Sequence, residues 1–149
     1  MKVLIDADAC PVLEIAAQEC RRRRAALLLF CDTSHELNVP SAQTVTVSRG
    51  ADSADFALVN RAEKGDLVVT QDYGLAAMCL AKGARVLNQD GKEYRSDNIE
   101  GLLAARWEHK KQRMAGKHPR GPKKRTAAQD QRFREAFSAL LDALMPKND

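Results

Sequence analysis

Residues 2–8 read KVLIDAD, an apolar run that ends in two aspartates separated by one residue. We expect the apolar part, Lys2–Ile5, to form a β-strand. Residues two apart in an extended segment lie on one face, so Asp6 and Asp8 can reach the same ion just beyond the strand. Asp8 has a second interpretation, because it can instead cap a helix that begins near Pro11. This stretch therefore predicts a strand with carboxylates at its downstream end.

Further short apolar runs follow in the first ninety residues, and helical patterns separate most of them. Alternating strands and helices are typical of a parallel sheet covered by helices, and such a sheet binds ligands at the carboxyl ends of its strands. The predicted strands are Lys2–Ile5, Leu27–Cys31, Thr44–Val47, Leu67–Thr70 and Arg85–Leu87. The predicted helices run from Pro11 to Arg24, from Ala54 to Ala62 and from Gly74 to Lys82. The fold class is a three-layer α/β sheet of the Rossmann-like kind.

The last third of the chain is predicted to be helical. Asp97 and Glu100 have the spacing of a capping box, which opens a helix that continues past Trp107. Glycine and proline at 116–122 require a loop, and the final helix gathers apolar side chains on one face, which can serve the core or a dimer. We predict a single domain over residues 1–149, with an acidic α/β core at 1–95 and a basic helical extension at 96–149.

Acidic residues follow nearly every predicted strand. Carboxylates gathered at one edge repel one another unless a cation lies among them, and hard divalent metals prefer oxygen ligands. Each acid also has a plain structural interpretation, as a helix cap or as a partner of a helix dipole. The pattern predicts a Mg²⁺ or Mn²⁺ site whose ligands are Asp6, Asp8, Asp52, Asp55 and Asp72, with Asp6 and Asp72 as the catalytic pair.

Such a site suits phosphoryl chemistry. Two cations roughly 3.5–4 Å apart activate water and stabilise both oxygens of an in-line displacement, with no need for a histidine or cysteine nucleophile. No P-loop, G-x-G-x-x-G or G-x-S-x-G motif is present. The four cysteines form no C-x-x-C pair, and no stretch approaches the ~20 apolar residues of a membrane span. We therefore expect a cytoplasmic, metal-dependent hydrolase that does not enter a membrane.

The net charge of +4 is unevenly distributed. Residues 106–125 hold nine lysines and arginines and one acid, whereas the rest of the chain holds 15 basic and 19 acidic residues. A basic run attracts phosphates, although a solvated surface is the plainer interpretation. Trp107, at its start, can stack on a base or pack its helix against the core. We expect a nucleic-acid backbone, RNA above all, to bind Arg106, Lys110, Lys111, Arg113, Lys117, Arg120, Lys123, Lys124 and Arg125.

The hexapeptide DADACP at residues 6–11 resembles the opening motif of the YaiI/YqxD family of small bacterial proteins. The similarity continues through ADSAD at 51–55, GDLVVTQD at 65–72 and the Gly-Pro pair at 121–122. This family resembles PIN-like nuclease domains, which implies metal-binding acids at the ends of the first and fourth strands and near a helix between them. Carried over to this chain, the resemblance implies an acidic centre of Asp6, Asp52 or Asp55, and Asp72.

Two other functions stay open. A D-x-D motif after a strand also opens phosphatases of the haloacid-dehalogenase type, in which the first aspartate, here Asp6, is the nucleophile and a later lysine assists. The second open function is that of a non-catalytic module, which binds RNA or a protein partner. Binding that persists without divalent metal would favour the module, and a phosphoryl adduct on Asp6 would favour the phosphatase.

Overall fold

Six strands form one sheet in the computed structural model, which describes residues 1–8, 10–32, 39–47, 53–114 and 124–146. The strand order is β3-β2-β1-β4-β5-β6, and all neighbours are parallel except β5 and β6. The five predicted strands are confirmed, each to within one residue at either end. The sixth has only two residues, too few to give a pattern. The strands span Lys2–Asp6 (β1), Ala26–Asp32 (β2), Gln43–Val47 (β3), Leu67–Val69 (β4), Arg85–Leu87 (β5) and Glu93–Tyr94 (β6).

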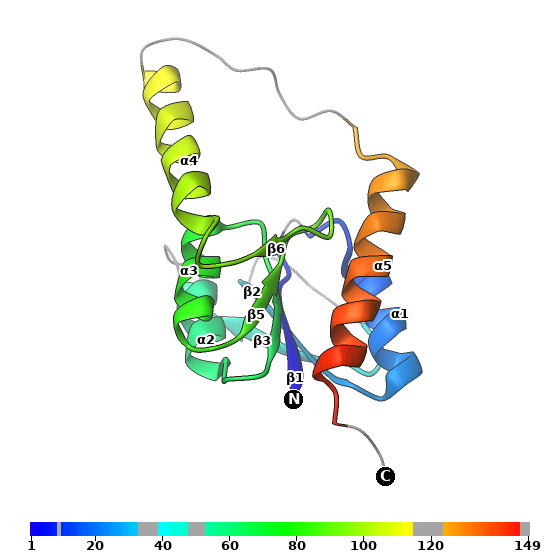
Figure 1. Ribbon diagram of the computed structural model, residues 1–149. Helices are drawn as coiled ribbons and strands as arrows, with labels where there is room; N and C mark the ends of the chain where they lie inside the picture. The colour runs from blue at the N-terminus through cyan, green and yellow to red at the C-terminus, as the bar shows by residue number, and fades with distance from the viewer. Residues whose placement is uncertain (9, 33–38, 48–52, 115–123, 147–149) are drawn as a thin grey trace.

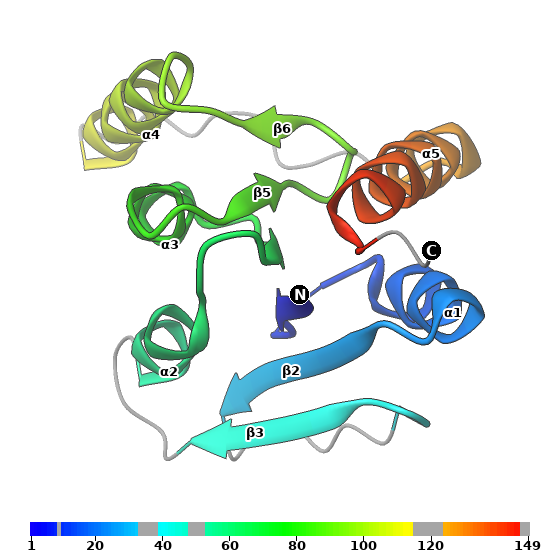
Figure 2. The same cartoon turned by 60° about the horizontal axis from the view of Figure 1, so that its bottom comes forward.

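Helices cover both faces of the sheet, which confirms the predicted three-layer arrangement (Figure 1 and Figure 2). Successive residues of a strand point to opposite faces, so neighbours in β1 join different layers. Val3 and Ile5 pack toward α1 and α5, whereas Leu4 packs toward the opposite layer. The helices are α1 (Leu13–Arg23) and α5 (Ala127–Leu144) on one face, and α2 (Ser53–Arg61), α3 (Tyr73–Ala81) and α4 (Ile99–Met114) on the other.

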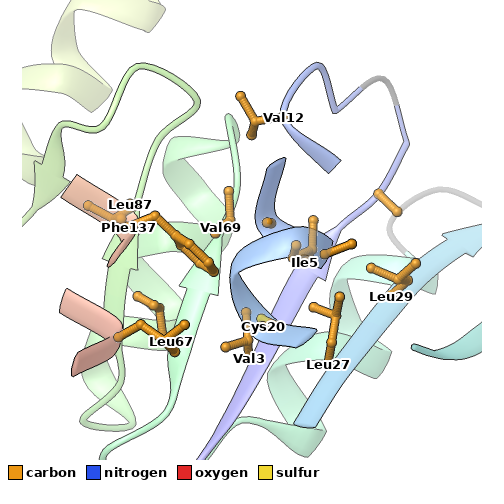
Figure 3. Close-up of a cluster of buried hydrophobic side chains, with 14 of the residues drawn as sticks. Val3, Ile5, Val12, Cys20, Leu27, Leu29, Leu67, Val69, Leu87 and Phe137 are labelled. Carbon is orange, nitrogen blue, oxygen red and sulfur yellow. The ribbon is translucent and has the colours of Figure 1, made fainter. Parts of the chain in front are cut away.

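Apolar side chains of the central strands fill the space beneath α1 and α5, as Figure 3 shows for Ile5, Leu67 and Val69. Phe137 of α5 enters the same cluster and stacks on Phe133 with ring centroids 5.3 Å apart. Both rings are fully buried, and burial of such a side chain contributes about 1.5–3 kcal/mol. Helix α5 is therefore an integral layer of the fold, although it follows the basic segment in the sequence.

A buried acid joins α1 to α5. Glu19 is 1% exposed, and its carboxylate accepts from Arg23 Nη1 at 2.7 Å and from Arg134 Nη1 at 2.9 Å. Burial alone would raise the pKa of Glu19, but the hydrogen bonds from Arg23 and Arg134 outweigh burial and lower it. The arginine run that ends α1 thus does more than complement the helix dipole, because it also neutralises a carboxylate in the interface between two helices.

The starts of the last two helices differ from each other. Thr126 and Gln129 form a capping box at the start of α5, in which Thr126 Oγ1 accepts from the Gln129 N–H at 3.2 Å. Helix α4 begins at Ile99, later than a capping box at Asp97 predicts. The Asp97 carboxylate instead accepts from Arg95 Nε at 3.0 Å. The Asp97 carboxylate, which the sequence spacing assigned to the start of the helix, therefore pairs with the guanidinium of Arg95.

The lengths and compositions of the helices bear on the membrane prediction. Within the part of the chain that the structure describes, no helix combines the length and the apolar character needed to cross a bilayer. The longest described helix, α5, is apolar along one side only, with its aromatic residues toward the sheet.

Candidate active site

The connections of the sheet change direction between β1 and β4. The chain runs outward from β1 through β2 to β3 on one side, and from β4 through β5 to β6 on the other. In an open α/β sheet, such a switch point leaves a crevice at the carboxyl ends of the strands, where ligands bind. Asp6 is the last residue of β1, and the register that pairs Ile5 with Val69 sets Thr70 beside it. A carboxylate thus stands at the position that the topology favours for a ligand.

Asp6 is held by the hydroxyl of Thr70. Thr70 Oγ1 donates to Asp6 Oδ2 at 3.1 Å and accepts from the backbone N–H of Asp72 at 3.0 Å. Thr70 is 2% exposed, so water has little access to this hydroxyl. Burial, which is the largest effect, and the charges of Asp55, Asp8 and Asp72 together raise the pKa of Asp6 from its ordinary value of 3.8 to about 6, against the opposing effect of the Thr70 hydrogen bond.

These effects show that four of the five predicted acids lie at one edge of the sheet. They come from the end of β1, the segment after it, the first turn of α2 and the turn between β4 and α3. Like charges at close range disfavour ionisation, and a cation among them would reverse the effect. The structure therefore brings Asp6, Asp8, Asp55 and Asp72 together, whereas Asp52 lies outside the described residues.

Asp8 has a different partner from the one its alternative interpretation required. Helix α1 has Val12 at its N-cap and no side-chain cap, so a capping role for Asp8 is wrong. The Asp8 carboxylate instead accepts from the backbone N–H of Asp32, with Oδ2 at 3.3 Å. This bond ties the D-x-D segment to the end of β2. It also holds Asp8 at the carboxyl edge of the sheet.

Asp72 does cap a helix, as its structural interpretation predicted. Asp72 Oδ1 accepts from the Leu75 N–H at 3.1 Å at the start of α3. A carboxylate has about four lone-pair positions, so a cap and a metal contact are compatible. Asp55 stands in the first turn of α2 and is half-buried. The helix-dipole interpretation of Asp55 and its place in the acidic cluster are both consistent with this position.

The four gathered side chains are chemically suited to a hard divalent cation. All four gathered side chains are carboxylates, which Mg²⁺ and Mn²⁺ prefer as ligands, and their mutual repulsion raises the pKa of Asp6. Within the described residues, however, no three His, Cys, Asp or Glu side chains are arranged so that they could hold a metal ion as they stand. A metal complex of these acids would therefore require some adjustment of side chains or a contribution from Asp52.

Apart from Arg125, the predicted nucleic-acid contacts divide into three groups. Lys110 and Lys111 on α4 and Lys124 before α5 are exposed. Arg106 and Arg113 belong to α4, but the structure does not describe their side chains. The remaining loop positions, Lys117, Arg120 and Lys123, lie outside the described residues.

Arg125 is an anchor between α5 and the loop after β5. Its Nη1 donates to Asp90 Oδ1 at 2.8 Å, its Nε to Asp130 at 2.5 Å and its Nη2 to the backbone oxygen of Gln89 at 2.5 Å. These bonds fix the end of the basic segment on the fold, a role beyond the predicted contact with nucleic acid. Sequence spacing gave no signal for this role, because Asp90 lies 35 residues upstream.

The same guanidinium lies near the acidic edge. Burial is the main effect that raises the pKa of the Cys10 thiol, and the opposing charges of Asp6 and Arg125 both act on that sulfur. A raised pKa leaves the thiol protonated and therefore unreactive. The basic segment therefore ends, at Arg125, close to the acidic edge of the sheet.

The fold and this site define a doubly wound α/β protein with an acidic centre at the switch point of its sheet. The family model described as "Uncharacterized BCR, YaiI/YqxD family" matches residues 4–143. The chain therefore belongs to the YaiI/YqxD family, which confirms the resemblance seen in its motifs.

Related bacterial proteins agree with this assignment. A UPF0178 protein of Clostridium acetobutylicum is 46% identical over 143 residues, which cover 95% of this chain and 97% of the relative. A UPF0178 protein of Exiguobacterium sibiricum is 45% identical, with 95% and 96% of the two chains covered, and one of Bacillus cereus is 42% identical, with 95% and 99% covered. No solved structure matches this chain significantly.

Proposed function

We propose that this protein hydrolyses phosphodiester bonds, with RNA as the favoured substrate, through a Mg²⁺ or Mn²⁺ centre held by its aspartates. The observation that carries the proposal is the gathering of four carboxylates at the switch point, where burial and the neighbouring charges raise the pKa of Asp6 to about 6. Perturbed carboxylates at a ligand-binding edge are characteristic of functional sites. Repulsion among carboxylates that come from separate elements also lowers the stability of the fold. These acids are therefore expected to have a role other than stabilising the structure.

The roles of the residues follow from their contacts. Asp6 and Asp72 are the central ligands, and Asp8, Asp52 and Asp55 complete the set. Thr70 positions both central acids, since its hydroxyl donates to Asp6 and accepts from the backbone of Asp72. A bound divalent cation would supply an activated water and neutralise the phosphate oxygens. The exposed lysines of α4 would hold the backbone of the nucleic acid, whose charge the acidic edge alone would repel.

The decisive experiment compares cleavage of an end-labelled RNA oligonucleotide by the wild type and by an Asp6→Asn, Asp72→Asn double variant. We expect Mn²⁺-dependent cleavage by the wild type, none with chelator and none by the variant. Asp97→Asn is the matched control, because Asp97 is an exposed acid that pairs with Arg95. Cleavage that survives the double substitution would refute the assignment of the site.

A phosphatase of the haloacid-dehalogenase type has less support. That chemistry needs a lysine beside the nucleophilic aspartate. Among the described residues, the groups that shift the pKa of Asp6 are three carboxylates and the Thr70 hydroxyl, in addition to burial. This environment favours a cation ligand over a nucleophile.

A non-catalytic RNA-binding module is the second candidate function. It is favoured by the same observation that complicates metal binding, namely that the described acids do not form a ready-made metal site. In this case RNA would bind equally well with chelator and with Mn²⁺, and no RNA would be cleaved. The assay above separates the two candidates, because it measures cleavage and metal dependence together.

A further inference from the structure

Helix α4 leaves the body of the protein along its second half. Its first turns pack on the sheet through Ile99, Leu102 and Leu103. Beyond them, every residue whose side chain the structure describes is exposed, namely Ala104, Ala105, Trp107, Glu108, Lys110 and Lys111. Figure 1 shows this half of α4 rising past the carboxyl edge of the sheet, on the same side as the start of α5. Both described ends of the basic segment therefore lie on the side of the acidic site.

Trp107 is the most unusual residue on this exposed half. It is the only tryptophan in the chain, and 53% of it is exposed. Tryptophan is highly buried on average and has a large apolar surface, so an exposed tryptophan offers a ligand an extensive apolar contact. The alternative role that the sequence left open, packing of α4 against the core, falls instead to Ile99 and the two leucines.

Two lysines accompany the exposed ring. The Nζ atoms of Lys110 and Lys111 lie 5.8 and 5.7 Å from the ring centroid of Trp107, within the range of cation–π interactions. The ring is therefore a flat apolar surface with two positive charges beside it. A nucleobase next to a phosphate has the complementary features, a flat π-face and a negative charge.

We propose that Trp107, Lys110 and Lys111 form a stacking platform for an unpaired nucleobase and its phosphates, and that the protein thereby selects single-stranded over double-stranded RNA. Base–aromatic stacking requires a base that is free of its own helix. The charge of the segment favours a polyanion, since residues 106–125 hold nine basic residues and one acid. The inference deepens the proposed function, on which it rests for the choice of RNA as the polymer.

The single tryptophan gives a direct test. Its fluorescence is measured during titration, in chelator, with a ten-nucleotide oligouridine, with an RNA duplex of similar length and with poly-glutamate. We expect strong quenching by the single strand, and weak quenching and weaker binding by the duplex and the acidic peptide. Equal binding of duplex and single strand would overturn the inference, and so would equal quenching by poly-glutamate, which would instead identify a protein-type partner.

Variants locate the effect on the platform. In anisotropy measurements with labelled oligouridine, Trp107→Ala should weaken binding about 5- to 100-fold, in line with the loss of one stacked base. Trp107→Phe should restore most of the affinity, because it retains a ring and thereby controls for damage to the helix. Phe56→Ala is the matched control, since Phe56 is 58% exposed on α2, and binding should stay unchanged. The inference fails if Trp107→Ala binds like the wild type.

The lysines contribute a second readout. Replacing both Lys110 and Lys111 with alanine should reduce the salt dependence of binding, with the slope of log K against log salt falling by about 1–2. A slope that does not change would place the phosphates elsewhere and overturn the platform. Because these experiments use chelator, they are independent of catalysis. Quenching without any cleavage would refute the proposed hydrolase and support the platform. Cleavage that is the same for single strands and duplexes, and that Trp107→Ala does not change, would refute the platform and support the hydrolase.

Discussion

Replacing Asp6 with asparagine should make the protein more stable at neutral pH while it removes the centre of the site. Asp6 has its pKa raised from 3.8 to about 6. A shift of about two units corresponds to roughly 3 kcal/mol at 1.36 kcal/mol per unit. Asp6 is partly accessible to solvent, so screening reduces the gain to about 1–2 kcal/mol. Asparagine keeps an oxygen that accepts from Thr70, so the substitution removes the charge with little loss of hydrogen bonding.

The pH dependence gives the sign of this effect. Between pH 4 and pH 6 the folded Asp6 retains a proton that the unfolded Asp6 has lost, so ionisation works against folding as the pH rises. The wild type should therefore lose stability across this window relative to Asp6→Asn. The two proteins should be equally stable near pH 3.5, and the variant should have its full advantage above pH 6.5.

Urea unfolding in chelator, at several pH values from 3.5 to 8, measures the difference through the transition midpoint. Asp97→Asn, which removes an exposed carboxylate, should show no advantage that grows with pH. Addition of Mn²⁺ should then stabilise the wild type more than Asp6→Asn, because a ligand of the folded state raises its stability. An advantage of Asp6→Asn that is absent, or that is the same at pH 3.5 and pH 7.5, would refute the argument that repulsion and burial strain this carboxylate.

Three further substitutions test other parts of the structure. Thr70→Val should cost about 1 kcal/mol and raise the pKa of Asp6 further, since it removes a hydrogen bond that lowers that pKa. An unchanged titration of Asp6 by NMR would contradict this. Glu19→Gln should cost about 3 kcal/mol at pH 7 in urea unfolding, because Arg22, Arg23 and Arg134 lose the buried charge that they pair with, and the loss should shrink as acid protonates the wild type. A cost independent of pH would count against the ion pairs. Gly91→Ala should lower the melting temperature more than Gly65→Ala. Both glycines have positive φ, but of the two only Gly91 would bring a Cβ against the backbone, at 2.7 Å. Equal effects would show that this contact is unimportant.

The sheet could be predicted from the sequence because its signal is local. Leu67–Val69 and the other central strands are continuous apolar runs, as strands buried on both faces must be. The paired faces of β1 follow from strand periodicity alone. The two-residue β6 and the late start of α4 were beyond this reasoning, because the first carries no period and the second depends on a competing bond between Arg95 and Asp97.

The site was harder to predict, because its contacts join distant parts of the chain. The placement of Asp6 and Asp72 at one edge followed from the expected parallel sheet, whereas the adjacency of β1 and β4 came from the structure. The bond between Asp8 and the backbone of Asp32 spans 24 residues, and the anchoring of Arg125 spans 35. Neither partner leaves a mark in spacing or composition. The sequence therefore predicted which acids face one edge, but not what else holds them there.

Two acidic residues among those that the structure describes, Glu19 and Asp66, are buried, and their partners contrast with those of the partly buried Asp6. Glu19 is held by arginines, and Asp66 accepts from the Lys2 ammonium at 2.7 Å, so both follow the rule that buried charges are paired. Asp6 departs from that rule, since the described charges that act on it are other carboxylates. Among the described residues, the carboxylates around Asp6 at the switch point, where folds of this class bind ligands, support the proposal that a cation pairs with this acid.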